Sequence, residues 1–196
     1  MRMVPDVAAI GSADVDRAMA TLTAAFIGDP LMRWAFPDAH TYLHAFPLFA
    51  KAYGTAGIAS GSAFRAGGFG GVSIWLSPDH RGDDKTAAAV CKASMQPGRL
   101  DEFGRLMEEV YAYHPQDEPI WYLPFIGVDA AHQGHGLGSA LMKHTLAMCD
   151  THPTRAFLES SNPANISLYE RHGFEVMARV QFGSSPPVHP MIREKR

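Results

Sequence analysis

The sequence predicts an α/β fold in which one mixed, mostly antiparallel sheet is flanked by helices. Two strand-like segments, Ser62 to Ala66 and Val72 to Leu76, lie on either side of a glycine-rich turn, as in an antiparallel hairpin. The second half of the chain alternates strand, helix, strand, helix and strand, as in βα units. Because no linker divides the 196 residues, we expect a single domain over 1–196.

In the first half, hydrophobic residues recur at the spacing of a helix face in three places. The first helix is expected from Asp14 to Phe26 and is followed by a turn at Gly28 to Pro30. A second helical period runs from Tyr42 to Tyr53 and is expected to be interrupted near Pro47, because proline cannot donate a helix hydrogen bond. A third helix is expected from Leu100 to Tyr113.

The second half has a more regular pattern. Strands are expected at Trp121 to Val128, Arg155 to Glu159, Phe174 to Phe182 and, as a last edge strand, Met191 to Arg193. Helices are expected at Leu137 to Cys149 and Pro163 to His172. Asn162 is a favourable N-cap for the second of these helices, and Gly173 suits its end.

The composition is that of a soluble globular protein, with 46% hydrophobic and 19% charged residues. A formal net charge of −3 provides no basic field, so nucleic acid is an unfavourable partner. No apolar run approaches the roughly 20 residues that cross a bilayer, so no membrane partner is expected. The two distant cysteines, Cys91 and Cys149, fit free thiols in a reducing compartment, and we expect a cytoplasmic protein.

A glycine-rich loop, Gln133 to Gly138, joins the strand at 121–128 to the helix at 137–149. Glycines at alternate positions expose backbone N–H groups, and the helix start adds the positive end of a helix dipole. No Asp or Glu occurs between Ala130 and Cys149, where Lys143 and two histidines add favourable charge. The loop therefore indicates a phosphate site, and the alternative is a tight turn without a ligand.

Two other classes of phosphate loop fit less well. A nucleoside-triphosphate loop needs Lys-Ser or Lys-Thr after its glycines, and neither follows here. A dinucleotide loop needs G-x-G-x-x-G/A directly after its strand. Here Ser139 takes the third glycine position after Gly134 and Gly136, and five residues separate the strand from the first glycine. The acidic residue that ends the next strand, Glu159, keeps the dinucleotide reading open.

The loop and the segments after it resemble the GNAT superfamily of N-acetyltransferases. Gln133-x-x-Gly136-x-Gly138 matches the signature [QR]-x-x-G-x-[GA] of that family. Leu158 to Ser161 and Asn165 to Phe174 are also similar to it. The resemblance is strong over 121–182, which it identifies as the acetyl-CoA-binding core, and loose over 1–120, the acceptor-side half. The entry into the strand at Trp121 resembles the small-molecule branch that includes puromycin acetyltransferase.

The resemblance implies how acetyl-CoA would be held. The strand before the loop would part from the next strand, and the pantetheine arm would pair with main-chain groups of Ile126 and Val128. A backbone N–H near Gly127 or Val128 would stabilise the thioester oxygen as negative charge develops. The cofactor-binding residues implied around the pyrophosphate are Gln133, Gly134, His135, Gly136, Leu137, Gly138 and Ser139.

Two residues of the helix at 163–172 match functional positions of the family. Tyr169 matches the tyrosine whose phenol protonates the leaving thiolate, and a phenol of pKa about 10 suits that task. Asn165, one helical turn earlier, matches an asparagine that hydrogen-bonds the CoA arm. The alternatives are a core tyrosine and a surface asparagine.

The acceptor amine must lose a proton before it attacks the acetyl carbonyl, so a general base is needed. Glu159 is the leading candidate, directly or through water, and its alternative is a carboxylate tied to the backbone or to Arg171. His114 and Glu118 are weaker candidates. His132 and His135 have the spacing H-x-x-H but no convincing further ligand, so we expect no metal.

The acceptor is expected to be the primary amine of a small molecule, attacked directly in a ternary complex. Asp29-Pro30 with Arg33, Trp34 and Phe36 resembles one acceptor wall, and Trp75, Trp121 and Tyr122 are further aromatic candidates or core residues. The alternatives are an acyl-CoA-binding sensor without turnover and a dinucleotide oxidoreductase. A homodimer is left open, because the sequence does not indicate the oligomeric state.

Overall fold

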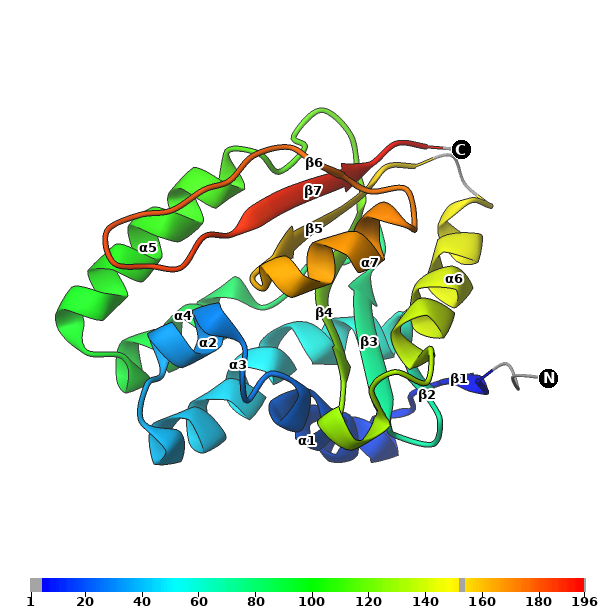
Figure 1. Cartoon of the computed structure of the whole chain (residues 1–196), viewed down its shortest axis with the longest axis horizontal. Coiled ribbons are helices and arrows are strands. Elements are labelled where there is room, and N and C mark those ends of the chain that lie inside the picture. The colour runs from blue at the N-terminus through cyan, green and yellow to red at the C-terminus, as the bar shows by residue number, and fades with distance from the viewer. Residues whose placement is uncertain (1–4, 152–153, 196) are drawn as a thin grey trace.

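The computed structural model describes residues 5–151 and 154–195, and its centre is one mixed sheet (Figure 1). Seven described strands form it in the order β1-β2-β3-β4-β5-β7-β6. Their bounds are β1 Val7–Ala9, β2 Ala63–Ala66, β3 Gly71–Leu76, β4 Trp121–Val128, β5 Ala156–Ser160, β6 Glu175–Val176 and β7 His189–Arg193. Among these strands, β4 and β5 pair in parallel and every other neighbouring pair is antiparallel. The predicted single α/β domain with a mostly antiparallel sheet is thereby confirmed.

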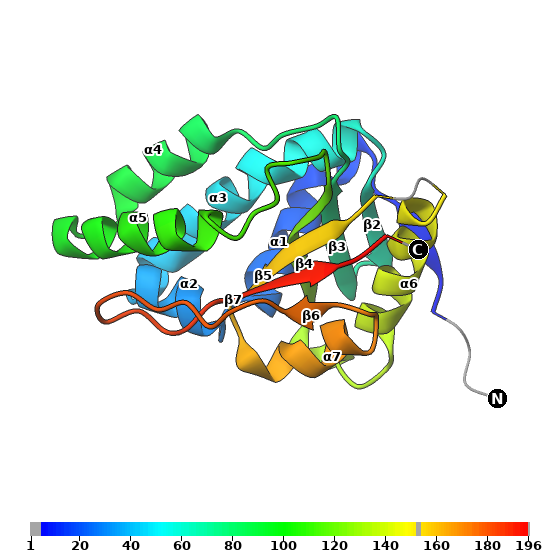
Figure 2. The same ribbon diagram turned by 90° about the horizontal axis from the view of Figure 1, so that it is seen from above.

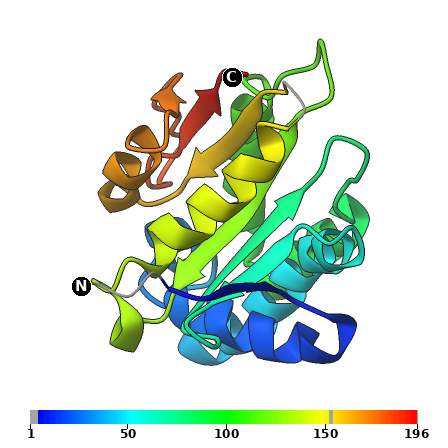
Figure 3. The same cartoon turned by 90° about the vertical axis from the view of Figure 1, so that its right-hand side faces the viewer.

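Helices cover both faces of the sheet. Their bounds are α1 Val15–Ala25, α2 Pro30–Ala35, α3 Ala39–Ala59, α4 Asp84–Ser94, α5 Pro97–Tyr111, α6 Leu137–Cys149 and α7 Ile166–Glu170. Three short 3-10 turns, η1 Ser12–Asp14, η2 Ala130–His132 and η3 Pro163–Asn165, precede α1, the glycine loop and α7. Figure 2 shows α6 and α7 on one side of the sheet and α3 and α4 on the other. In Figure 3, α6 (yellow) lies in front of the sheet and runs along the direction of the neighbouring strands.

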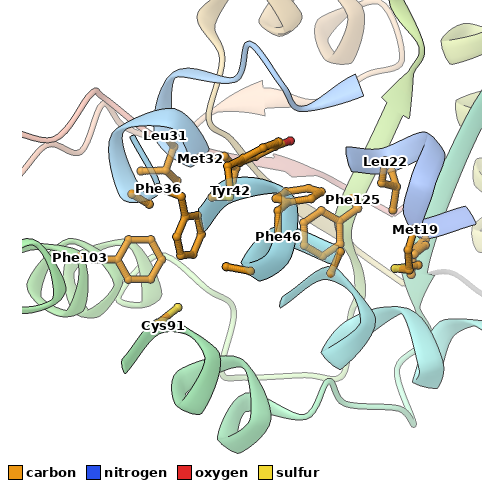
Figure 4. Packing of buried hydrophobic residues seen from close by; sticks show 14 of the residues in the cluster. Met19, Leu22, Leu31, Met32, Phe36, Tyr42, Phe46, Cys91, Phe103 and Phe125 are labelled. Carbon is orange, nitrogen blue, oxygen red and sulfur yellow. The ribbon is translucent and has the colours of Figure 1, made fainter. Parts of the chain in front are cut away.

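The larger core lies between the sheet and the helices α1 to α5 (Figure 4). Phe46 of α3 is its centre, because its ring stacks on Phe26 at 5.3 Å and meets Phe125 of β4 edge-on at 6.0 Å. Such aromatic contacts add to the free energy gained by burying large apolar surfaces. They fix α1 and α3 against the middle of β4, which is the strand that leads into the glycine loop.

The strands β4 and β5 separate from each other partway along their length. They pair from Trp121 to Leu123 against Ala156 to Leu158. Beyond this point β4 pairs with β3, and β5 pairs with β7. A β-bulge contributes to the separation. Phe125 pairs with Ile74 and Tyr122 with Leu76, so β4 contains one more residue than β3 between these two pairs. The separation expected from the family resemblance is therefore present.

The bulge also changes which side chains share a face of the sheet. Tyr122 and Phe125 both point toward the helices α1 to α5, where Tyr122 contacts His114 and Phe125 contacts Phe26. Leu123 instead packs in the core beneath α6 and α7. Without the extra residue, regular alternation would place Tyr122 and Phe125 on opposite faces.

Several predicted elements agree closely with the structure. The strand Trp121–Val128 and the helix Leu137–Cys149 have the predicted bounds. The predicted hairpin is β2 and β3, and the side chain of Asn162 accepts a hydrogen bond from the backbone N–H of Ala164 at 3.0 Å. Gly173 has the positive φ of 87° that suits the end of a helix.

Three predicted elements are wrong, and three were missed. The helix α3 continues through Pro47. Because proline has no N–H, the carbonyl of Leu43 lacks its helix hydrogen bond, but Leu43 is 52% exposed, so water can take that place. The strand predicted at 174–182 is reduced to β6, after which the chain leaves the sheet. The last strand, β7, is not an edge strand, since it lies between β5 and β6. The strand β1 and the helices α2 and α4 were not predicted.

Candidate active site

The glycine loop has the geometry of an anion site at the start of α6. Gly134 and Gly136 have φ angles of 76° and 81°, which residues other than glycine rarely adopt. Gly136 is the N-cap of α6, so the first backbone N–H groups of a 13-residue helix lie at the loop. The side chain of Gln133 donates to the carbonyl of Val128 at 3.2 Å and fixes the loop to the end of β4.

A cavity of about 540 Å³, here called the cofactor cavity, opens between this loop, the end of α1 and α7. All of the predicted cofactor residues except His135 line it, as does Tyr169. The lining members of the predicted set are Ile126, Gly127, Val128, Gln133, Gly134, Gly136, Leu137, Gly138, Ser139 and Asn165. Residues distant in sequence are therefore brought together around one space.

His135 is exposed and turned back toward its own loop, where its Nδ1 lies 3.2 Å from the carbonyl oxygen of His132. His132 itself lines the cofactor cavity. Arg171 also lines it and was not predicted as a cofactor residue. Its position directly after α7, beside the glycine loop, could have been inferred only once the helix was placed against that loop.

Between the separated strands lies a smaller cavity of about 30 Å³, here called the junction cavity. It is lined by Leu123 and Pro124 of β4 and by Leu158 and Glu159 of β5. Tyr169 lines both the junction cavity and the cofactor cavity. A space of this volume can hold a water molecule where polar groups surround it.

Tyr169 is buried, with 6% of its surface exposed. Burial raises the pKa of its phenol, and the negative charge of Asp29 adds to this effect. The phenol therefore keeps its proton at neutral pH. Its ring meets that of Phe174 edge-on at 6.4 Å, which fixes the direction of the side chain.

Glu159 is partly buried at the end of β5. Burial raises the pKa of its carboxyl group to about 7, against a smaller opposing effect of a hydrogen bond donated by the hydroxyl of Tyr122. Arg171, which was considered as a partner of Glu159, instead donates to the hydroxyl of Ser167 at 3.3 Å. A carboxylate that is half protonated near neutral pH can accept a proton from an amine and later release it.

Asp29 lines the cofactor cavity. Its carboxylate accepts hydrogen bonds from the backbone N–H of Met32 at 2.9 Å and from the hydroxyl of Ser161 at 2.7 Å. These bonds connect the start of α2 to the end of β5 across the site. Burial raises the pKa of Asp29 despite both bonds.

A third cavity, of about 430 Å³ and here called the acceptor cavity, lies on the α3 and α5 side of the sheet. Glu159 lines both this cavity and the junction cavity, so one carboxylate borders both spaces. Tyr53 of α3, His114 and Tyr122 also line it. Burial lowers the pKa of His114, whose ring lies 5.5 Å from that of Tyr122.

The other residues considered for the acceptor side lie elsewhere. Trp75 and Trp121 are core residues, with 0% and 9% of their surfaces exposed. Trp34 donates through its indole N–H to the hydroxyl of Ser184, and Arg99 lies 4.6 Å above its ring. Phe36 is buried in the larger core. None of the residues 29–36 is among the lining residues of the acceptor cavity, so the acceptor wall expected there stays a prediction.

Glu118 is held by an ion pair. Its carboxylate accepts from Nε of Arg155 at 2.6 Å and lies 3.4 Å from Nζ of Lys195. These contacts lower its pKa, mainly through the hydrogen bond from Arg155. A carboxylate so neutralised is a weak proton acceptor, and it does not line the acceptor cavity.

Within residues 5–151 and 154–195, no group of three or more histidine, cysteine, aspartate or glutamate side chains is placed to hold a metal ion. In the same part of the chain, no helix is both long and apolar enough to cross a membrane.

A model of the acetyltransferase (GNAT) family matches residues 83–174. An uncharacterized N-acetyltransferase of Schizosaccharomyces pombe is 26% identical over 203 residues, covering 92% of this chain and 80% of that protein. A solved structure from Corynebacterium glutamicum, described as histone acetyltransferase HPA2 and related acetyltransferase, is 26% identical. It has a TM-score of 0.69 and covers 99% of this chain and 98% of that one.

Two insect structures share the fold at lower identity. Arylalkylamine N-acetyltransferase 2 from Aedes aegypti is 13% identical with a TM-score of 0.66, covering 97% of this chain and 98% of that one. A Drosophila melanogaster polyamine N-acetyltransferase, described as forming N-acetylagmatine, is 14% identical with the same TM-score of 0.66. It covers 97% of this chain and 99% of that one.

Proposed function

The chain belongs to the GNAT family of N-acetyltransferases, and from this premise we propose that it moves an acetyl group from acetyl-CoA to the primary amine of a small molecule. The observation that carries the proposal is that Glu159 and Tyr169 border one junction cavity, which adjoins both larger cavities. A donor and an acceptor that enter by separate cavities would meet there. The narrower resemblance to puromycin acetyltransferase stays a prediction.

The proposed donor site is the cofactor cavity. The glycine loop and the start of α6 would bind the pyrophosphate, and Arg171 and His132 line the same space. Main-chain groups at Ile126 to Val128 would pair with the pantetheine arm in the gap that β5 leaves. Bound acetyl-CoA would supply the thioester whose acetyl group is transferred.

Glu159 is proposed as the general base. It lines the acceptor cavity, from which a protonated amine would approach, and its raised pKa matches the pH at which it must take up a proton. The junction cavity is large enough for one water molecule, so the proton can travel directly or through that water. The hydrogen bond from Tyr122 orients the carboxylate.

Tyr169 is proposed as the general acid. The neutral amine attacks the acetyl carbonyl, the carbon–sulfur bond breaks, and the thiolate takes the phenol proton of Tyr169. The proton that the nitrogen releases as the amide forms then restores the phenol. A backbone N–H near Gly127 or Val128 would stabilise the negative charge on the carbonyl oxygen. Because burial raises the pKa of Tyr169, the phenol is still protonated when the thiolate forms beside it and can donate a hydrogen bond or its proton to the sulfur.

Two measurements test the proposal. Thermal-shift titrations with acetyl-CoA and with NADH separate the donor from a dinucleotide, and we expect stabilisation by acetyl-CoA alone. Thiol release is then measured over a panel of amines, where acetylation must appear with at least one. Stabilisation by NADH alone would support the oxidoreductase alternative, and binding of acetyl-CoA without thiol release would support the sensor alternative.

A further inference from the structure

We propose that the acceptor is an arylalkylamine, that is, a primary amine on a short chain that ends in an aromatic ring. The inference rests on the proposed function and adds the substrate class. The amine would lie at Glu159, and the ring would occupy the outer part of the acceptor cavity. The walls, the floor and the net charge of that cavity each support this assignment.

The walls of the acceptor cavity are aromatic. Tyr53 and Tyr122 lie near Glu159, since the charge of this carboxylate acts on both phenols. Farther from it, the ring of Tyr111 stacks on that of His114 at 5.6 Å with an interplanar angle of 23°. Tyr111 is nevertheless 61% exposed, so one side of this stacked pair is open. A substrate ring can stack there and bury apolar surface that is otherwise in water.

The floor of the cavity is apolar. Leu76, Val110 and Ile120 line it, and each has at most 3% of its surface exposed. Met107 adds a partly buried thioether, which adapts to the shape of an aromatic ring. A hydrocarbon or aromatic group can replace water on this floor, whereas an ammonium group placed against Leu76, Val110 and Ile120 would lose hydration without gaining a partner there.

The charges around the cavity favour a substrate with one positive charge. The carboxylates of Glu159 and Asp84 and the guanidinium of Arg81 leave a single net negative charge. Asp84 also accepts a hydrogen bond from the hydroxyl of Tyr53 at 3.1 Å. The remaining titratable lining groups are His80, bonded to Ser77 at 2.7 Å, and His114, whose pKa is lowered by burial. A polyamine would bring two or more charges into this space beside Arg81, and this disfavours it.

The likeness of the fold does not separate these two substrate classes. The arylalkylamine enzyme from Aedes aegypti and the polyamine enzyme from Drosophila melanogaster match this chain with the same TM-score of 0.66. The choice between arylalkylamines and polyamines therefore rests on the side chains that line the acceptor cavity.

The test compares amines that differ in one property. Thiol release is measured with 2-phenylethylamine, with hexylamine as a chain without a ring, and with 1,4-diaminobutane and agmatine as dications. We expect kcat/KM for 2-phenylethylamine to exceed that for each of the others by at least tenfold. A dication that equals or exceeds 2-phenylethylamine would overturn the inference, and so would an equal kcat/KM for hexylamine.

Two variants show whether the ring lies at Tyr111. Replacing Tyr111 by Ala should lower kcat/KM for 2-phenylethylamine about tenfold and lower that for hexylamine by a clearly smaller factor. Tyr113→Ala is the matched control, because Tyr113 is 38% exposed and does not line the cavity. Equal losses for both amines would contradict the placement of the ring. Stabilisation by acetyl-CoA without turnover of any amine would refute the proposed function itself, which is a different result from a changed preference.

Discussion

Replacing Glu159 by Gln removes the proposed general base while keeping the size of the side chain and a carbonyl that can accept from Tyr122. General base catalysis contributes about 10² to 10⁴-fold, so kcat/KM at pH 8 should fall by that factor. In the wild type, log kcat/KM should bend near pH 7, because the carboxyl group, whose pKa is about 7, must be ionised to act. The variant should lack this bend.

The same substitution should make the protein more stable above neutral pH. The pKa of Glu159 rises on folding from an ordinary 4.5 to about 7, so the folded state favours the protonated carboxyl group. The wild type therefore loses stability as the pH rises from about 4.5 through 7. Since a tenfold change in an acid constant is about 1.4 kcal/mol, the loss approaches about 3 kcal/mol at pH 8. The uncharged glutamine avoids it.

The assay pairs steady-state thiol release with thermal melts at pH 5 and pH 8. Glu170→Gln is the matched control, because Glu170 is exposed and lines none of the three cavities. Activity within threefold of the wild type would refute the role of Glu159 as the base. An inactive variant whose Tm differs from the wild type equally at both pH values would refute the argument from burial.

Three further substitutions test other parts of the site and fold. Tyr169→Phe should lower kcat about 10²-fold with little change in the Kd of acetyl-CoA by calorimetry, and an unchanged kcat would exclude the phenol as the acid. Gly138→Glu should abolish acetyl-CoA binding without changing Tm, because a Cβ there lies no closer than 3.6 Å to its neighbours; a preserved Kd would contradict the pyrophosphate site. Asp150→Ala should lower stability by about 3 kcal/mol in denaturant melts, since it leaves the buried guanidinium of Arg193 unpaired, and a loss below about 1 kcal/mol would contradict that pairing.

The donor half could be predicted from the sequence because its signals are local. The glycine loop, the strand before it and the helix after it are consecutive, so spacing and glycine placement determine them together. The positive φ angles of Gly134 and Gly136 give a physical reason for two of the three glycines. Gly138 has an ordinary φ, and a Cβ there would make only ordinary contacts with Leu168 and Val128, so the proposed ligand is the remaining reason for the third glycine.

The acceptor half could not be predicted in the same way, because its residues come from separate elements. Tyr53 lies on α3, Asp84 begins α4 and Tyr111 ends α5, and only packing brings them to Glu159. The helix α4 itself was missed because it buries little, with Ala87 and Cys91 as its buried residues. The sequence feature that indicates the start of α4 is the N-cap Asp83. Its side chain accepts a hydrogen bond from the backbone N–H of Thr86 at 3.0 Å.

The strand β4 shows why the direction of side chains was the least predictable property. Regular alternation along Trp121–Val128 places Tyr122 with Ile126, whereas the bulge turns Tyr122 toward the acceptor cavity together with Phe125. A bulge depends on the pairing of β4 with β3, about 50 residues away in the sequence, and not on the strand alone. Propensity identified the strand but could not indicate the extra residue.

The separation of the two large cavities has a consequence for the order of binding. Among the described residues, none lines both the cofactor cavity and the acceptor cavity, and the junction cavity shares lining residues with each of them. Neither substrate therefore blocks the entrance of the other. CoA can leave through the cofactor cavity, and the acetylated amine can leave through the acceptor cavity. If the proposed function holds, either substrate can bind first, and initial rates measured with both substrate concentrations varied would show this random order.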